Sequence, residues 1–515
     1  MNIAQKILII YVVILLFLLG GCTAQDKSNN PSAKKSTIIY NDISNFESFE
    51  KYFVLKEREI SETEINNVIK AISAINPNLL STSSSVPENS NGNFVFNNPT
   101  LNKSLTIKQI KLQGAHMQKG ILSFDRIDLS DIKFESRSNE AISVENITII
   151  SPKLETANLI LLSLQNSQKT KENEFKLNDL LKQGGQALAI KDFSISNEHG
   201  TYKIGSIIWG RDQKKETSDF QVVNIEFLGK DNIGNGIEAS LSSFSIMGIS
   251  GNPLQNFLIP PNLENIYNSF LETTFKLYNS IEIKDLNLKS EYVNLKIEAF
   301  TNKLTKLSGV TKNRYSSSPI TIELKNSPPS KEVTRVFEIM EKIGYKKITF
   351  QHSQESELDI NNNTLKINNG LISVNSGFDL SYNYDISNLN KPIDIKNYKA
   401  NINQLRLDEF QLRFDDKSIL ERVIKFYATE VRKTTQDQVK SELATVLTLA
   451  PLMTKGLFSE LSGELSSELI KLINDGGSLS IIIKPEKPIS ISTIIKSENS
   501  GLSKKEIGFS AKAEK

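Results

Sequence analysis

The segment AIKDFSISNEHGTYKIGSIIW, residues 189–209, carries the pattern that decides the fold. Its first part places apolar residues in the order Ile-Lys-x-apolar-x-apolar, and its last part is a second apolar run that ends at Trp209. Between them, Asn197-Glu198-His199-Gly200 supplies residues typical of turns. Because successive side chains of a strand point to opposite faces of a sheet, the segment predicts an antiparallel hairpin with one buried face.

The same motif returns elsewhere in the chain. It occurs as TIKQIKL (106–112) and EIKDLNL (282–288), and ANINQLRL (400–407) is a weaker copy. Each copy precedes a turn and a second apolar run, but the spacing between copies is irregular, which excludes a solenoid of fixed period. Two interpretations remain open: true internal repetition, or a pattern that any amphipathic hairpin shows in a chain rich in Lys and Ile.

Further alternating runs at 107–112, 121–124, 127–134, 144–150 and 346–386 predict more half-buried strands. Helices are predicted where apolar residues recur every three or four positions, at 61–75, 261–278, 331–343, 417–449 and 456–473. Two short strands around a Pro-x-x-Pro turn are predicted at 477–495. We therefore expect an α+β protein: predominantly antiparallel β-sheet in hairpins and meanders, with amphipathic cover helices and a helical C-terminal region.

The N-terminus predicts an exported protein with a lipid anchor. Lys6 precedes thirteen apolar residues (7–19), and Gly20, Gly21 and the only cysteine of the chain, Cys22, follow. A run of thirteen is too short to cross a bilayer but fits the hydrophobic core of a signal peptide. The ending Leu19-Gly20-Gly21-Cys22 resembles the bacterial lipobox. That resemblance implies cleavage before Cys22 and acylation of its sulfur and of the new amino group.

This prediction places the protein on a membrane surface of the cell envelope, facing the periplasm. The acylated Cys22 would hold it there, because two or more acyl chains bind stably where one binds only marginally. Thr23 stands where an Asp would favour retention at the inner membrane, so its presence favours the outer membrane. A lone cysteine also leaves no disulfide within the chain.

Length and composition bound the domain organisation. The 515 residues exceed one compact core. We expect a signal peptide at 1–21, an acylated tether at 22–40, a small helical region with a loop at 41–94, a hairpin-rich domain at 95–328, and a meander followed by helices and terminal strands at 329–515. The net charge of +2 and the scarcity of Arg give no basis for binding nucleic acid.

The sequence predicts no catalytic residue, metal ligand or cofactor. Its three histidines, His116, His199 and His352, lie in separate contexts without the spacing of metal ligands. No G-x-S-x-G or phosphate-binding loop motif is present. The stretch DNIGNGIE (231–238) weakly resembles a calcium loop, but its Asn-Gly pair favours a hairpin turn.

Three further residue groups receive structural interpretations. Asp415 and Asp416 precede the predicted helix at 417 and are expected to cap it, with Arg422 as their partner at helical spacing. Adjacent carboxylates could also act as an acid/base pair, but a cap explains them sufficiently. Trp209, the only tryptophan, is expected in the core.

The C-terminal region, residues 330–495, follows a distinctive order of segments: GYKKITF, an alternating meander, FDDKSILERVIKFYA, paired helices, a Gly-Gly-Ser-Leu-Ser strand and KPEKPIS. In this order it resembles a group of uncharacterised exported envelope proteins of Gram-negative bacteria. The hairpin-rich middle is loosely similar to AsmA-type envelope proteins, whose long sheets are linked to lipid handling. Neither resemblance implies catalytic residues.

Two functions from different classes follow. The first is a membrane-anchored binding or scaffold module that handles a lipid or an envelope protein partner, because half-covered sheets leave room for a groove. The alternative is a carboxylate-based glycan or cell-wall hydrolase, which would need two acidic residues converging in a cleft. We expect the binding module and no enzyme.

Overall fold

The computed structural model describes residues 49–55, 59–81, 92–99, 105–135, 141–163, 185–198, 200–212, 214–230, 234–250, 278–326, 331–389, 404–453, 457–495 and 502–515. The predicted signal peptide, Cys22, the predicted tether and most of the helix predicted at 261–278 lie outside these residues. The described residues belong to two compact units, called here the N-terminal unit (49–250) and the C-terminal unit (278–515). The fold is predominantly antiparallel β-sheet with several helices, so the predicted α+β class is confirmed.

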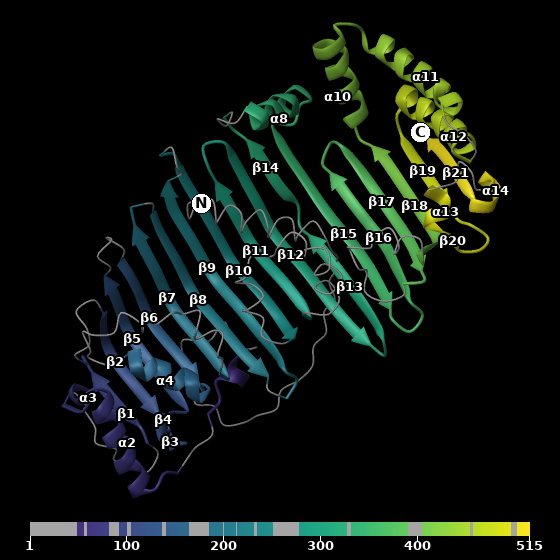
Figure 1. The fold of residues 1–515 in the computed structure, drawn as a ribbon. Helices are drawn as coiled ribbons and strands as arrows, with labels where there is room; N and C mark the ends of the chain where they lie inside the picture. Colours follow the sequence, from purple (N-terminus) through teal and green to yellow (C-terminus); the bar gives the residue numbers. More distant parts are fainter. Residues whose placement is uncertain are drawn as a thin grey trace. The chain divides into compact units, whose positions relative to one another are not determined.

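The N-terminal unit is an antiparallel meander. Its strands are β1 Phe94–Asn97, β2 Leu105–Gln113, β3 His116–Gln118, β4 Ile121–Ser123, β5 Arg126–Glu135, β6 Ala141–Ile150, β7 Ala187–Asn197, β8 Gly200–Asp212, β9 Thr217–Lys230 and β10 Gly236–Ser250. They pair in the order β1-β2-β5-β6-β7-β8-β9-β10, while β3 and β4 form a separate ribbon (Figure 1). The segment 189–209 lies in the β7–β8 hairpin, which closes at the pair Asn197 and Gly200.

Among the described residues, three α-helices cover one face of this unit and form its main core with Leu188 and Trp209, while a short 3-10 helix packs on the opposite face with Ala187 and Ile208. The α-helices are α2 Glu62–Ile75, α3 Pro77–Ser81 and α4 Leu154–Ser163, and the 3-10 helix is η1 Glu50–Tyr52. Helix α2 begins where the sequence predicted, because the Ser61 hydroxyl accepts the N–H of Glu64 at 3.3 Å. Trp209 is 6% exposed and belongs to the core that includes Ile72, Ile110 and Ile160, which confirms its predicted place.

Residues 49–53 attach to the sheet through a buried carboxylate. Asp219 accepts the Tyr52 hydroxyl at 2.7 Å, the Lys51 ammonium at 3.2 Å and the Gly248 N–H at 2.7 Å. Burial, followed by the hydrogen bond to Asp219, raises the pKa of Tyr52. The Tyr52 ring lies against Gly210, where a Cβ atom would stand 2.0 Å from the ring. The chain therefore enters the folded unit at a fixed point on the sheet.

Left-handed residues interrupt alternate strands of the meander. Asp131 in β5, Asp192 in β7 and Asn224 in β9 have φ of 51°, 48° and 54°. The pairing steps over each of them; for example, Lys191 pairs with Ser206 and Phe193 with Ile204. Asp285 of the C-terminal unit has the same conformation with φ of 51°. The shared Ile-Lys-Asp of 189–195 and 282–288 therefore marks a local kink, since Asp and Asn tolerate this region best after Gly.

We expect Asp192→Ala to destabilise the N-terminal unit by about 1–2 kcal/mol, the usual cost of a left-handed conformation at a residue with a Cβ. Asp192→Asn keeps a side chain suited to this conformation and should change stability by less than about 0.5 kcal/mol. Urea denaturation followed through Trp209, which faces Leu188 of β7, measures both changes. Equal destabilisation by the two variants would contradict this assignment.

The C-terminal unit is a second antiparallel meander with helices. Its strands are β11 Ser280–Lys289, β12 Val293–Leu307, β13 Val310–Ser317, β14 Ile320–Leu324, β15 Lys347–Asp359, β16 Thr364–Val374, β17 Phe378–Ser387, β18 Arg406–Asp416, β19 Ser478–Ile483, β20 Ile489–Ser490 and β21 Phe509–Glu514. Its helices are α8 Lys331–Lys342, α10 Ile419–Phe426, η3 Tyr427–Arg432, α11 Gln436–Met453, α12 Leu457–Asp475, α13 Ile491–Ile495 and α14 Lys504–Ile507. Strands β13 and β14 both pair with β15, so the sheet continues across the boundary predicted at residue 328.

Two predicted elements differ in the structure. The helix predicted at 417–449 is broken: the π-helical segment η3 follows α10, and Lys433 adopts a left-handed conformation with φ of 53°. A new helix then begins because the Thr435 hydroxyl accepts the N–H of Gln438 at 3.2 Å. The predicted second terminal strand is reduced to Ile489–Ser490, since residues 491–495 are helical.

The last strand, β21, is protected by glutamates of α12. One side of β21 pairs with β19. The N–H groups of Ala511 and Ala513 donate instead to Glu464 at 2.7 Å and to Glu468 at 2.8 Å. An edge strand with unpaired N–H groups can pair with a strand of another chain. By accepting these N–H groups, the two carboxylates block such pairing.

Protonation should weaken this protection. The Ala513 N–H, followed by Lys471, holds the pKa of Glu468 below its ordinary value. The stabilisation is therefore complete above about pH 4.3, the ordinary pKa of Glu, and is lost as pH falls through the lowered value. We expect the variant Glu464→Ala/Glu468→Ala to lose about 1 kcal/mol per missing acceptor at pH 7 and to aggregate faster, as followed by light scattering. The variant with two Gln residues, which keeps two acceptors, should behave nearly as the wild type.

Candidate functional site

An apolar sheet face in the C-terminal unit is the candidate functional site. On β17, apolar side chains occupy every second position from Phe378 to Ile386. The register continues this face into the neighbouring strands: Ile372, Leu380 and Phe414 form one row. We call it the apolar face, and its residues are Leu365, Ile367, Ile372, Val374, Phe378, Leu380, Tyr382, Tyr384, Ile386, Leu407, Phe410, Leu412 and Phe414.

Apart from Ile367, which is buried, these side chains are incompletely covered. All residues of β17 and the apolar members on β18 are half-buried, whereas the cores of both units contain side chains below 5% exposure. The neighbouring strands differ, because α12 packs on β19 and β21 through Leu457, Ile507 and Phe509. Large half-exposed apolar surfaces on a folded domain mark binding sites.

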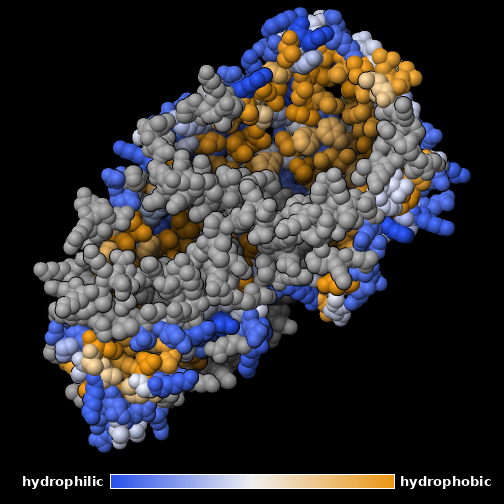
Figure 2. Space-filling view, viewed as in Figure 1, coloured by the Kyte–Doolittle hydropathy of each residue, from blue (hydrophilic) through white to orange (hydrophobic). Residues whose placement is uncertain are grey.

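Figure 2 shows where this surface lies. Hydrophobic side chains gather over β15–β18, next to α10 and α11, and hydrophilic residues border them along the upper margin. The adjoining helices also expose apolar side chains: Leu452 and Met453 at the end of α11 are each 81% exposed, and Val446 is 62% exposed. Helical apolar residues therefore extend the surface beyond the sheet.

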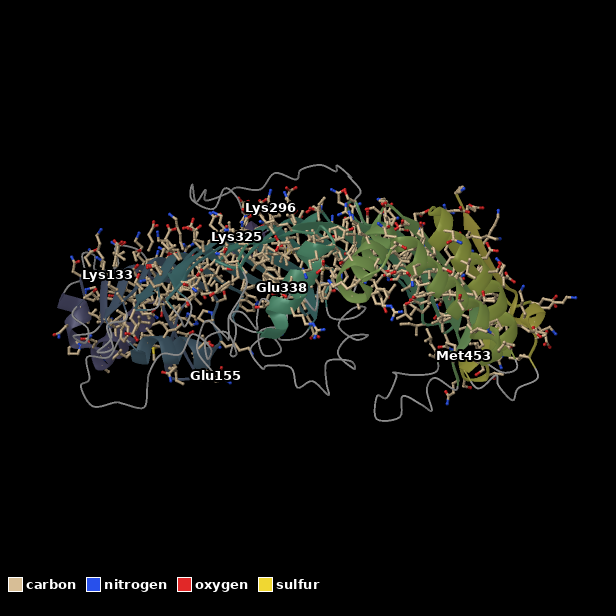
Figure 3. All side chains as sticks on the ribbon, turned by 90° about the horizontal axis from the view of Figure 1, so that it is seen from above. Lys133, Glu155, Lys296, Lys325, Glu338 and Met453 are labelled. Atoms are coloured by element: carbon tan, nitrogen blue, oxygen red, sulfur yellow. The ribbon has the colours of Figure 1, made fainter. Side chains whose placement is uncertain are left out.

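The opposite face of the same strands is polar and ion-paired. Its residues pair across strands as Lys366 with Asp385 at 2.8 Å and Lys417 with Asp379 at 2.6 Å. Figure 3 views the unit from another side and places Lys296 of β12 and Met453 of α11 on opposite sides of the sheet. The two faces of these strands therefore differ strongly in polarity.

A hydrogen-bonded chain crosses the margin of the apolar face. Tyr382 donates to Gln354 at 2.5 Å, so it accepts from Nε2 of His352 at 2.9 Å. The Nδ1 atom of His352 is then the acceptor for the Tyr315 hydroxyl at 3.0 Å. Burial lowers the pKa of His352, which keeps the ring neutral. These hydrogen-bonded side chains place polar but uncharged groups beside the apolar residues.

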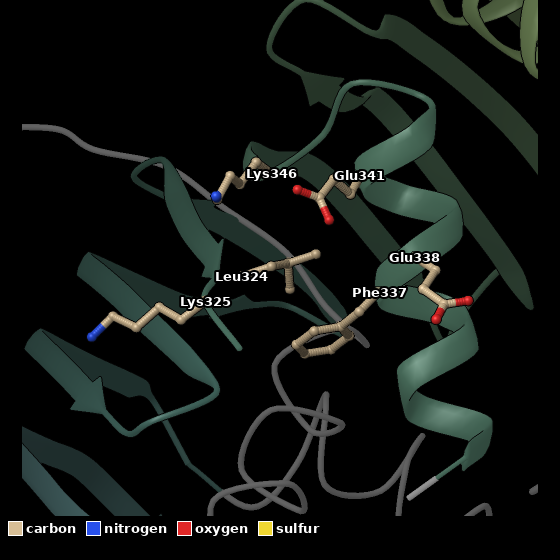
Figure 4. Close-up of a pocket in the computed structure, with 6 residues that line it drawn as sticks. All are labelled: Leu324, Lys325, Phe337, Glu338, Glu341 and Lys346. Atoms are coloured by element: carbon tan, nitrogen blue, oxygen red, sulfur yellow. The ribbon is translucent and has the colours of Figure 1, made fainter. Parts of the chain in front are cut away.

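Figure 4 shows a small recess between α8 and β14. Phe337 of α8 faces Leu324 of β14, and Glu341 points toward Lys346. Lys325 and Glu338 complete the lining. The recess is small and mostly polar, so it does not match the apolar face as a binding surface.

The structure places some of the residues singled out from sequence. Asp416 caps α10 as predicted, accepting the N–H of Leu420 at 3.1 Å. Asp415 points to the other face and pairs with Arg413 at 2.8 Å.

The predicted pairing of Arg422 with the acidic cap is wrong. Its guanidinium donates to Ser418 at 2.9 Å and to the carbonyl oxygens of Ile343 and Gly344 at the end of α8, at 3.4 and 3.2 Å. A helix C-terminus attracts a cation because its last carbonyl groups lack helical partners. Arg422 thus joins α8 to α10.

The stretch DNIGNGIE and the histidines form no metal-binding group in the part of the chain that the structure describes. The part of DNIGNGIE that the structure describes begins β10, which pairs Gly236 with Lys230 of β9 in a hairpin. His116 and His352 lie in different units, and His199 lies outside the description. In the described ranges, no group of three or more His, Cys, Asp or Glu residues could hold a metal ion. Among the described helices, none has both the length and the hydropathy needed to span a bilayer.

Among the residues that the structure describes, the carboxylates of Glu145 and Asp192 come together on the open surface of the N-terminal unit. A hydrogen bond to Asp192, followed by one to Lys191, lowers the pKa of Glu145, and the bond to Glu145 raises the pKa of Asp192. A glycosidase needs its two carboxyl groups about 5–10 Å apart to admit the sugar or a water. Directly bonded carboxyl groups on an open strand surface do not fit that requirement.

Comparison with known proteins gives one match. A family model described as an uncharacterized protein matches residues 371–514. The matched range begins within β16 and ends with β21, so it includes β17, β18 and most of the apolar face. No curated protein matches the chain.

Sequence reasoning did not locate the apolar face. The alternation on β16–β18 was visible, but it resembles that of every other strand in the chain. The distinguishing property is that the helices among the described residues leave this face half-exposed, which depends on where distant helices dock.

Proposed function

We propose that the protein is a membrane-anchored envelope lipoprotein whose C-terminal unit binds the acyl chain of a lipid. The observation that carries this proposal is the half-buried apolar face on β16–β18. A protein partner would also cover such a face. Thirteen aliphatic and aromatic side chains form the face, and Asp416, which continues their row on β18, is engaged at its edge as the cap of α10. This largely apolar composition favours an acyl chain.

The energetics support binding of useful strength. Burial of one methylene contributes about 0.8 kcal/mol. Burying about ten methylenes would contribute about 8 kcal/mol before the costs of association, which corresponds to micromolar affinity or weaker. Strand β17 has ten residues and spans about 33 Å, which is long enough to accommodate an extended chain.

The predicted anchor complements this activity. Acylation of Cys22 would keep the binding face beside a lipid reservoir and raise its effective concentration. The polar residues 23–40 would act as a flexible tether between the membrane and the folded part.

Mass spectrometry of the purified protein tests the proposal. We expect the full chain, extracted in mild detergent, to carry about one noncovalent lipid per chain, in addition to acyl groups on Cys22. Extraction with organic solvent should release this lipid for identification. Protein that retains no lipid, and that binds no fatty acid when one is added back, would overturn the proposal.

A further inference from the structure

A cluster of buried polar side chains lies on the same sheet face, beyond the apolar residues of β16. His352 pairs with Ile372 and Ser356 with Ile367, so the polar residues of β15 share the face of those apolar side chains. The register then places Asn313 of β13 opposite Ser356. Further buried polar residues on this face come from β12, β13 and β15. We call this the polar cluster; it comprises Asn302, Asn313, Tyr315, His352, Gln354 and Ser356.

Three members have buried atoms without hydrogen-bond partners. Asn313 is 0% exposed, and neither its Oδ1 nor its Nδ2 atom is bonded. The Ser356 hydroxyl and the Asn302 Oδ1 atom are also buried and unbonded. Asn302 and Tyr315 are register partners, so the three lie on neighbouring strands. Buried polar groups are nearly always bonded, and leaving them unbonded costs stability. Their concentration at one place points to a polar ligand.

The chemistry of the cluster identifies the class of ligand. Amide and hydroxyl groups both donate and accept hydrogen bonds, as a ligand hydroxyl does. A carboxylate or phosphate only accepts and is best held by Arg or Lys. His352 is neutral, and none of the six cluster residues is Lys or Arg. Lys306 of β12 lies on the same side and pairs with Thr311, two residues from Asn313, and burial lowers the pKa of its ammonium group. The cluster suits an uncharged head.

We propose that the polar cluster binds the uncharged, hydroxyl-bearing head of an amphiphile whose acyl chain lies on the apolar face. This inference rests on the proposed function, and it adds that the site selects lipids by their head group. Asn313 and Ser356 would bond the head, while the chain would extend toward β17 and β18.

Three ligands with one acyl chain test the head group. Monopalmitoylglycerol has hydroxyl groups, methyl palmitate has none, and palmitate is charged. Their affinities for the full-length protein can be measured by displacement of a fluorescent fatty acid. We expect monopalmitoylglycerol to bind about tenfold tighter than each of the others, the effect of one or two hydrogen bonds.

The variant Asn313→Leu/Ser356→Ala should remove this preference while leaving the affinity for methyl palmitate unchanged. It should also raise the melting temperature of the lipid-free protein by about 2–4 °C, because it removes unbonded buried groups. Ser316→Ala, on the other face of β13, is the matched control and should preserve the preference. If the double variant folds poorly, Ser356→Ala alone should reduce the preference about threefold, half the effect of the pair in free energy.

The outcomes separate the two proposals. Equal binding of the three lipids by the wild type, or a preference that survives in the variants, would overturn the head-group assignment and leave acyl-chain binding intact. Failure of all three lipids to bind would overturn both.

Discussion

Substitution of Cys22 by serine is expected to release the protein from the membrane. The prediction follows from the lipobox-like sequence that ends at Cys22, where the only thiol of the chain is available for acylation. Without acyl chains, the remaining contact with the bilayer would be an apolar run of thirteen residues, too short to span it. Each acyl chain contributes about 0.8 kcal/mol of membrane-binding free energy per buried methylene. Its loss should therefore lower the membrane-bound fraction of the correctly exported Cys22→Ser protein by more than about 100-fold relative to the wild type.

Fractionation of cells that express each variant measures this change. Thr23→Ser is the matched control, since it alters the next residue without removing the thiol, and it should remain bound. The mass of the mature N-terminus provides a second readout, which should show cleavage before residue 22 and attached acyl groups. A wild-type chain that still begins at Met1, or Cys22→Ser protein that sediments with membranes as fully as the wild type, would contradict the anchor.

Substitution of Leu380 and Leu412 by lysine is expected to abolish lipid binding. Both residues lie on the apolar face, Leu380 on β17 and Leu412 on β18. Two ammonium groups on this surface would have to lose water when an acyl chain covers them, a cost of several kcal/mol. Affinity for a fluorescent fatty acid should fall by more than about 100-fold. The fold should survive, because both positions are half-exposed and a lysine can direct its charge into water.

The neighbouring residues on the same strands supply the control. Ser381→Lys/Gln411→Lys adds the same charge to the polar face one position away, and it should leave lipid binding within about twofold of the wild type. Circular dichroism and melting curves establish that both variants fold. If the control loses binding as the test variant does, the effect is electrostatic and the apolar face is not the binding surface.

The sequence predicted the sheet but not its exposed face. Alternation in AIKDFSI and in 346–386 predicted strands that the structure confirms, and the helices predicted at 61–75 and 331–343 correspond to α2 and α8. The kinks at Asp192 and Asp285 coincide with the repeated Ile-Lys-Asp. The sequence shows this repeat, but only the structure shows that the backbone of the Asp is in the left-handed conformation.

Tertiary contacts determine the partner of Arg422 and the buried face of β15, neither of which the sequence reveals. Arg422 bonds the end of α8, which is distant in sequence, so helical spacing alone pointed to the wrong partner. The polar cluster was hidden in QHSQESE because this stretch is polar on both faces, and alternation cannot then identify the buried one. Asn313 stands between Lys312 and Arg314, where it resembles an ordinary exposed residue although it is completely buried.

Photochemical labelling tests acyl-chain binding by the apolar face most directly. A palmitate analogue with a diazirine on its chain would be bound to the full-length protein, irradiated, and the labelled peptides identified by mass spectrometry. The account predicts label on β16, β17 and β18, suppressed by excess palmitate and absent from the variant Leu380→Lys/Leu412→Lys. Label confined to the N-terminal unit, or label on these strands that excess palmitate does not displace, would contradict it.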